Sequence, residues 1–207
     1  MATDLPLVYF HSPNTRSTGP LILLEELGAD FELRVLDMGA DEQRGDAFRA
    51  LNPLGKVPAL LHGDALVTEQ IAIYTYLADL FPEKGLAPAL DDPLRGPYLR
   101  WMAIYAGCFE PAVIDRFMKR EPAPRAMSPY GDADELFAAI STQLETGPWM
   151  LGERFLALDV LWGTAMSWIT GFGLLEPTPA ISAYIERTGA RPAWQKVRAE
   201  DAERTGG

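Results

Sequence analysis

Cysteine and histidine are scarce in this sequence, and their scarcity excludes several kinds of chemistry. Cys108 is the single cysteine among 207 residues, so one chain cannot form an internal disulfide or a thiolate-rich metal site. His11 and His62 are the two histidines, and they lie far apart in the sequence, so a histidine-based zinc site is not expected. We therefore expect a protein of a reducing cytoplasm that uses no metal.

Basic residues and long apolar runs are also scarce. Lysine and arginine total 18 against 29 aspartates and glutamates, for a formal net charge of −11. This balance argues against nucleic acids and anionic membrane surfaces as partners, because both bind clustered basic side chains. No stretch approaches the ~18 apolar residues of a membrane span, and the first residues lack the basic region of a signal peptide. A cytoplasmic location is expected.

The first part of the sequence alternates between strand and helix patterns. Apolar runs and period-two alternation predict strands, and a Leu-rich stretch that ends at Gly28 predicts a helix. The expected order is strand Leu5–Phe10, helix Leu21–Leu27, strand Phe31–Val35, helix Asp41–Ala50, hairpin Val57–Leu61 with Ala65–Thr68, and helix Glu69–Phe81. Residues 1–81 therefore predict a small α/β domain of order βαβαββα with a mixed sheet.

The second part of the sequence is predicted to be helical throughout. Residues 82–91 form a Pro/Gly-punctuated connector without apolar periodicity, which is typical of a domain boundary. Asp92 and Pro93 are a suitable N-cap and first residue for a long helix to about Lys119, which Pro111 should bend. We expect an all-α domain over residues 92–207.

Two stretches suggest a binding site. In Leu51–Leu60 (LNPLGKVPAL), a proline at the start of a strand fits a cis Val57–Pro58 bond, which would turn the Val57 backbone outward toward an extended peptide. A trans proline in an edge strand is the alternative. Glu69 and Gln70 fall in the first turn of a helix, where free amides attract a carboxylate and Glu69 could meet an ammonium group. Alternatively, the negative charge of Glu69 interacts favourably with the positive end of the helix dipole and has no role in ligand binding.

Together with the polar loop His11–Thr18 (HSPNTRST), these motifs resemble those of the glutathione transferase family across essentially the whole chain. The resemblance implies a thioredoxin-like first domain, a helical second domain, a homodimer, and glutathione as co-substrate. By position, Val57 resembles the residue before the cis-proline, Pro58, whose backbone pairs with the cysteinyl unit of glutathione. Glu69 and Gln70 resemble the residues that hold the γ-glutamyl head, although serine is usual at position 70. Lys56 resembles a lysine that reaches glutathione in some classes.

The loop indicates which thiol chemistry to expect. Ser12 matches the spacing of the serine in theta- and zeta-like classes, whereas the cysteine of the beta class would fall at or next to Arg16. A serine hydroxyl that donates to the glutathione sulfur lowers the pKa of that thiol. Ser17 and Thr15 are alternative donors, with Asn14 a further candidate. Cys108 is expected to be a packing residue, which disfavours disulfide exchange through the enzyme.

The resemblance also implies an activity and a second binding pocket. We expect conjugation of glutathione to small hydrophobic electrophiles, or reduction of peroxides, as in detoxification. The alternatives are a zeta-like glutathione-dependent isomerase and a glutathione-binding or interaction protein with little turnover. Side chains that share helical spacing after the connector are candidates to line the electrophile pocket, although such stripes more often belong to a core. They are Trp101, Met102, Tyr105, Phe109 and Arg116.

Overall fold

A computed structural model describes residues 5–206 of the chain, which form two compact units. One contains residues 5–86 together with 191–206, and the other contains residues 87–190. Among the described residues, no helix is both long and apolar enough to cross a membrane.

The first unit is built on a mixed sheet of four strands in the order β2-β1-β3-β4. The strands are β1 (Leu7–His11), β2 (Phe31–Val35), β3 (Ala59–His62) and β4 (Ala65–Thr68). β1 pairs with β2 in parallel and with β3 antiparallel, and β3 forms an antiparallel hairpin with β4. The expected succession of strands along the chain and the mixed sheet are therefore confirmed.

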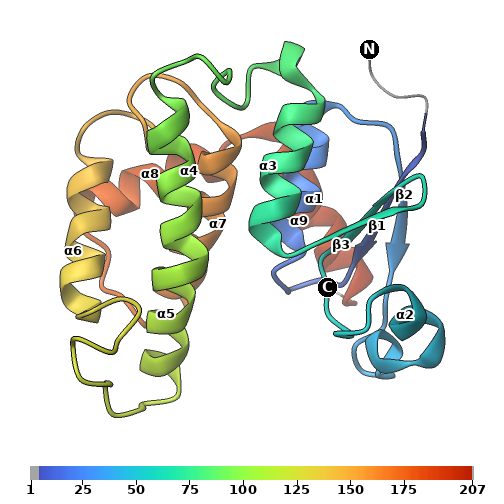
Figure 1. The fold of residues 1–207 in the computed structure, drawn as a ribbon, viewed down its shortest axis with the longest axis horizontal. Coiled ribbons are helices and arrows are strands. Elements are labelled where there is room, and N and C mark those ends of the chain that lie inside the picture. Colours follow the sequence, from blue (N-terminus) through green and yellow to red (C-terminus); the bar gives the residue numbers. More distant parts are fainter. Residues whose placement is uncertain (1–4, 207) are drawn as a thin grey trace. The chain divides into compact units, whose positions relative to one another are not determined.

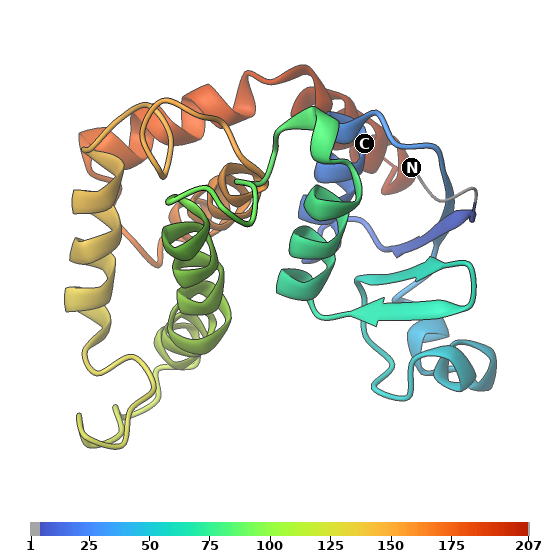
Figure 2. The same cartoon turned by 45° about the horizontal axis from the view of Figure 1, so that its top comes forward.

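Helices cover this sheet. The unit contains α1 (Thr18–Leu27), η1 (Glu42–Arg44), α2 (Asp46–Leu51), α3 (Gln70–Leu80), η2 (Pro82–Lys84) and α9 (Pro192–Arg204). α1 packs against α3 and α9, and α1 and α9 lie side by side in Figure 1, in blue and red. Gly28 ends α1 in the left-handed conformation, as expected. Figure 2 shows the β3–β4 hairpin leading directly into α3.

Alternation along β1 sends its side chains to opposite faces of the sheet. Phe10 belongs to an apolar cluster with Phe48 of α2 and Ala59 of β3. Tyr9 and His11 lie on the face opposite to Phe10. The Tyr9 hydroxyl donates to the Ser17 carbonyl. The rings of Tyr9 and His11 stack with their centroids 6.4 Å apart. Because both side chains are fully buried, β1 places the polar groups of Tyr9 and His11 next to the start of α1, where solvent does not reach them.

The C-terminal helix α9 packs within the first unit, although the sequence suggested one helical domain over residues 92–207. Arg191 binds both carboxylate oxygens of Glu26 on α1, at 2.6 and 2.7 Å. Lys196 lies 2.7 Å from the carboxylate of the neighbouring Glu25. These opposite charges are more than 160 positions apart in the sequence, so local patterning could not pair them.

The second unit is helical, as expected. Its elements are α4 (Arg95–Ile104), η3 (Tyr105–Phe109), α5 (Glu110–Phe117), α6 (Ala133–Leu144), α7 (Ala157–Gly171) and α8 (Pro179–Gly189). α7 is the most buried of them, and Trp162 at its centre makes edge contacts with the rings of Trp101, Tyr105 and Phe109. An aromatic core therefore holds this unit together.

The long helix expected from Pro93, after an Asp92 cap, to about Lys119 begins at Arg95 and is interrupted. The Asp92 carboxylate accepts the Leu94 amide at 2.8 Å, so it closes a turn just before α4. η3 is a π-helical turn that ends immediately before α5. Pro111 lacks an N–H, so the helix cannot make its ordinary bond to the carbonyl four residues earlier, and a π turn accommodates that loss.

α7 and α8 approach each other closely at Gly163. A Cβ built at this position would lie 2.8 Å from side-chain atoms of Thr188, and Thr188 is fully buried. We expect Gly163→Ala to lower the free energy of unfolding by about 1–3 kcal/mol, because overpacking forces the helices apart. Urea denaturation checks this, with Gly171→Ala as control, since no atom lies within 4 Å of a Cβ there. Equal stability of the two variants would contradict the expectation.

Candidate functional site

The strand register brings the three sequence motifs to one end of the sheet. Phe10 pairs with Ala59, and Ala59 pairs with Thr68. The end of β1, the start of β3 and the end of β4 are therefore adjacent. The loop after β1, the Val57–Pro58 bond and the N-terminus of α3 consequently meet at this edge, which agrees with the sequence-based expectation of a common site.

The Val57–Pro58 peptide bond is cis, as expected. Pro58 is buried, Val57 is half-buried, and Lys56 is exposed. Among the described residues, none of the loop and turn hydrogen bonds uses the backbone N–H or C=O of Val57. The Lys56 carbonyl instead accepts the side-chain amide of Asn52 at 2.8 Å. The Val57 backbone can therefore pair with an extended peptide.

Glu69 has an unusual backbone conformation at the N-terminus of α3. Its φ is 65° and its ψ is 125°, a region that residues other than glycine rarely occupy and that often marks a ligand-binding position. The side chain is exposed and does not cap the helix. The amides of the first turn and the Glu69 carboxylate are thus both available to a zwitterionic ligand.

Gln70 connects this helix start to the loop after β1. Its side-chain amide donates to the Arg16 carbonyl at 2.8 Å. The longer side chain that replaces the usual serine is thus directed to the loop. The backbone N–H of Gln70 lies in the first turn of α3, where amides have no partner within the helix.

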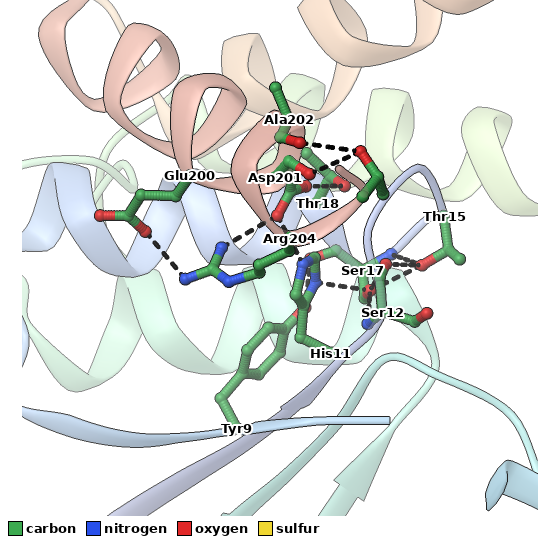
Figure 3. Close-up of polar contacts among 11 residues, drawn as sticks. Tyr9, His11, Ser12, Thr15, Ser17, Thr18, Glu200, Asp201, Ala202 and Arg204 are labelled. Atoms are coloured by element: carbon green, nitrogen blue, oxygen red, sulfur yellow. Dashed lines mark hydrogen bonds and ion pairs between the residues drawn. The ribbon is translucent and has the colours of Figure 1, made fainter. Parts of the chain in front are cut away.

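The hydroxyl of Ser17 is the centre of a hydrogen-bond network in the loop (Figure 3). It accepts the Ser12 amide at 3.0 Å and lies 3.1 Å from the Ser12 carbonyl, 2.6 Å from the Thr15 hydroxyl and 2.8 Å from His11 Nδ1. Thr15 also donates to the Ser12 carbonyl at 2.7 Å and accepts the Ser17 amide. Ser17 is fully buried. The hydroxyls of Thr15 and Ser17 are both occupied by hydrogen bonds that shape the loop.

Ser12 stands apart from this network through its side chain. Its backbone is held at both the N–H and the C=O, yet its hydroxyl makes no hydrogen bond to any residue of the described range 5–206, and Figure 3 shows it directed away from the dashed contacts. Ser12 is 4% exposed, whereas Ser17 is 0% exposed. Of the three hydroxyls considered from the sequence, that of Ser12 is the one left for a ligand.

A buried contact between His11 and Asp201 continues the network into α9. His11 Nε2 lies 2.9 Å from Asp201 Oδ1, and Thr18 donates to Asp201 Oδ2 at 3.0 Å. Arg204 donates to Asp201 Oδ1 at 3.0 Å. Burial alone would raise the pKa of Asp201, but the hydrogen bond and charge of His11, with the contacts of Thr18 and Arg204, lower the pKa below its usual value. Asp201 is therefore ionised in the folded protein.

The residues expected to line an electrophile pocket lie in the helical unit. Trp101, Met102, Tyr105 and Phe109 are between 1% and 5% exposed, and the three aromatic rings surround Trp162. Arg116 donates to the Leu174 carbonyl and pairs with Asp134. This burial shows that four of these side chains contribute to a core, and their role toward an electrophile stays a prediction.

Cys108 also lies in the helical unit, in the π turn η3. It is half-buried and its thiol donates to the Pro129 carbonyl at 3.3 Å. No group of three or more His, Cys, Asp or Glu side chains that could hold a metal is present in the described part of the chain.

Sequence reasoning missed Asp201 and the participation of His11. His11 was considered solely as a metal ligand, and Asp201 was assigned to the other domain. The complementary charges of Glu25 and Glu26 on α1 and of Arg191 and Lys196 near the C-terminus are the one signal that could have paired these helices.

Known proteins resemble this chain over nearly its full length. The family model described as "Glutathione S-transferase, N-terminal domain" matches residues 5–79. Glutathione S-transferase GstA of Escherichia coli O157:H7 is 30% identical over 189 residues, which are 90% of this chain and 94% of that protein. A glutathione transferase from Methylococcus capsulatus superposes with a TM-score of 0.81 at 31% identity, covering 95% of this chain and 99% of the other.

A second similar structure carries a ligand. It is a sphingomonad glutathione S-transferase complexed with glutathione, with a TM-score of 0.78, 30% identity, and coverage of 94% of this chain and 98% of that one. The similarity in sequence and in structure extends over at least 90% of this chain. The chain therefore belongs to the glutathione S-transferase family of enzymes.

Proposed function

We propose that this chain binds glutathione at the edge of the sheet formed by the loop after β1, Val57–Pro58 and the start of α3, and conjugates its thiolate to small hydrophobic electrophiles. The observation that carries the proposal is the Ser12 hydroxyl, which makes no hydrogen bond within residues 5–206 while the Ser12 backbone is fixed by hydrogen bonds at both polar groups. The sphingomonad relative with bound glutathione supports the choice of ligand.

The sulfur is the part of glutathione that Ser12 would contact. A hydroxyl that donates to a thiolate stabilises the charged form, and this lowers the pKa of the thiol from about 8.5. More thiolate is then present at neutral pH. The thiolate attacks an electrophilic carbon, a sulfur–carbon bond forms, and the leaving group departs with the bonding electrons. Ser12 forms no covalent bond, and Thr15 and Ser17 hold it in place.

The rest of glutathione fits the other two elements. The N–H and C=O of Val57, which have no hydrogen-bond partner in the described part of the chain, suit the backbone of the cysteinyl unit. The amides that begin α3 suit the γ-glutamyl carboxylate, and the exposed Glu69 carboxylate suits the ammonium group. Lys56 is exposed beside Val57 and is available to bind the second carboxylate of glutathione. By family resemblance we also propose a cytoplasmic homodimer.

Glutathione titration followed by a conjugation assay tests the proposed function. Binding together with turnover of a small electrophile is expected. Binding with no turnover of any electrophile would instead favour a glutathione-binding protein, and absence of binding would overturn the proposal.

We expect Glu69→Gln to raise the KM for glutathione roughly tenfold while kcat changes less than about twofold, because a hydrogen bond to a charged group is worth about 1.5–3 kcal/mol and this one acts in both ground and transition states. Steady-state kinetics with glutathione as the varied substrate measure this. Glu83→Gln is the matched control, since Glu83 is an exposed glutamate of the same unit. A fall in kcat with unchanged KM would contradict the assigned role.

A further inference from the structure

A continuous buried chain of polar groups runs from α9 to the loop that carries Ser12. Asp201 contacts His11 Nε2 at 2.9 Å, and His11 Nδ1 contacts the Ser17 hydroxyl at 2.8 Å. The Ser17 hydroxyl in turn lies 3.0 Å from the Ser12 amide. Figure 3 shows the dashed contacts that join Asp201 to His11 and His11 to Ser17. The chemistry at the sulfur uses none of His11, Asp201 or Ser17 directly, so their burial needs another explanation.

Asp201 determines which nitrogen of His11 carries a proton. An ionised carboxylate only accepts hydrogen bonds, so Nε2 must hold a proton to make the observed contact. In the neutral ring Nδ1 then has no proton and accepts the single Ser17 proton, which otherwise goes to the Ser12 carbonyl at 3.1 Å. In the charged ring Nδ1 donates instead. In either form the ring is held between Asp201 and Ser17 in one orientation.

The same chain explains how α9 reaches the loop. α9 is held near its start by Arg191 on Glu26 and by Lys196 on Glu25. Asp201 is held near its end by Thr18 and by Arg204. Because α9 is anchored along its length against α1, the position of Asp201 is fixed. Asp201 in turn fixes the ring of His11, and the His11 ring fixes the Ser17 hydroxyl.

We propose that His11 and Asp201 are positioning residues for the thiol-binding loop, which act through Ser17 to orient the Ser12 hydroxyl toward the glutathione sulfur. This inference rests on the proposed function. The charged or titratable groups around His11 are Asp201 and Arg204 from α9 and Tyr9 from β1. Burial is the main cause that raises the pKa of Tyr9 well above its usual value, so this phenol stays a donor to the Ser17 carbonyl.

Asp201→Asn tests the proposal in the full-length protein. An asparagine amide can donate to Nε2, so the alternative tautomer of His11 becomes accessible and the Ser17 hydroxyl loses its defined partner. We expect the pKa of the bound glutathione thiol to rise by about one unit and the conjugation rate at neutral pH to fall about tenfold, while the KM for glutathione changes less than about twofold. The thiolate absorbance of bound glutathione against pH reports the first quantity.

Two further variants make the test decisive. Glu200→Gln removes the same charge from the same helix without touching His11, because Glu200 pairs with Arg204 and Lys196; it should leave the thiol pKa at the wild-type value. Thr18→Val removes one hydrogen bond from Asp201 and keeps its charge; it should raise the thiol pKa in the same direction by a smaller amount. If Asp201→Asn does not fold, Thr18→Val decides.

The outcomes separate this inference from the proposed function. If the wild type binds glutathione with an unshifted thiol pKa, or does not bind it, the proposed function fails. If the wild type lowers the thiol pKa and the folded Asp201→Asn and Thr18→Val variants lower it equally, the positioning role is overturned and the proposed function stands.

Discussion

Replacing Ser12 by alanine should reduce conjugation at neutral pH about tenfold to a hundredfold with little change in stability. A hydrogen bond to a charged group is worth about 1.5–3 kcal/mol, and each 1.4 kcal/mol corresponds to a factor of ten in thiolate population. The Ser12 hydroxyl has no partner among residues 5–206, so its removal leaves no group of the protein unsatisfied. Rates measured with saturating glutathione, together with urea denaturation, check both parts.

Thr15→Val is the comparison that identifies the donor. Thr15 bonds the Ser12 carbonyl and the Ser17 amide, so its loss should weaken the loop and lower the stability by about 1 kcal/mol for each net hydrogen bond. Its effect on the rate should be smaller than that of Ser12→Ala. A Ser12→Ala variant with wild-type rates, beside a Thr15→Val variant without activity, would transfer the role to Thr15.

Asp159→Ala should produce the largest loss of stability, about 3–5 kcal/mol. Asp159 is fully buried and accepts the amides of Met150 at 2.7 Å and Leu156 at 2.8 Å and the hydroxyl of Tyr184 at 2.8 Å. Alanine leaves these donors buried without an acceptor, and each such group costs about 1–3 kcal/mol. Equilibrium denaturation in urea, monitored by tryptophan fluorescence, measures the loss.

Asp132→Ala is the matched control for this prediction. Asp132 caps α6 by accepting the amides of Asp134 and Glu135, but in an exposed position. Water can replace the lost acceptor there, so we expect about 1 kcal/mol. Stability losses of equal size for the two variants would show that burial of Asp159 does not increase the cost of removing its carboxylate.

Local patterns were sufficient to predict most elements of the fold. Alternation in Phe31–Val35 and the turn between His62 and Ala65 predicted strands that the structure contains within a residue or two. Asp132 lies two and three residues before the amides that it caps. These features depend on neighbours within a few positions, so a single sequence contains the information.

Features that depend on distant contacts were not predictable. The long helix begins at Arg95 and not at Pro93, and the Asp92 carboxylate before it accepts the Leu94 amide and pairs with the distant Arg154. The assignment of Asp201 to the first unit depends on ion pairs with α1 that span most of the chain. Within the site, spacing could suggest a serine, but the choice among the three hydroxyls needed the network around Ser17.

The pKa of the glutathione thiol in the complex tests the central claim most directly. It is obtained by titrating the thiolate absorbance of glutathione bound to the wild type and to Ser12→Ala. The account predicts a pKa below that of free glutathione in the wild type and a return toward the free value in Ser12→Ala. Equal pKa values in the two complexes would contradict the assignment of Ser12 to the sulfur.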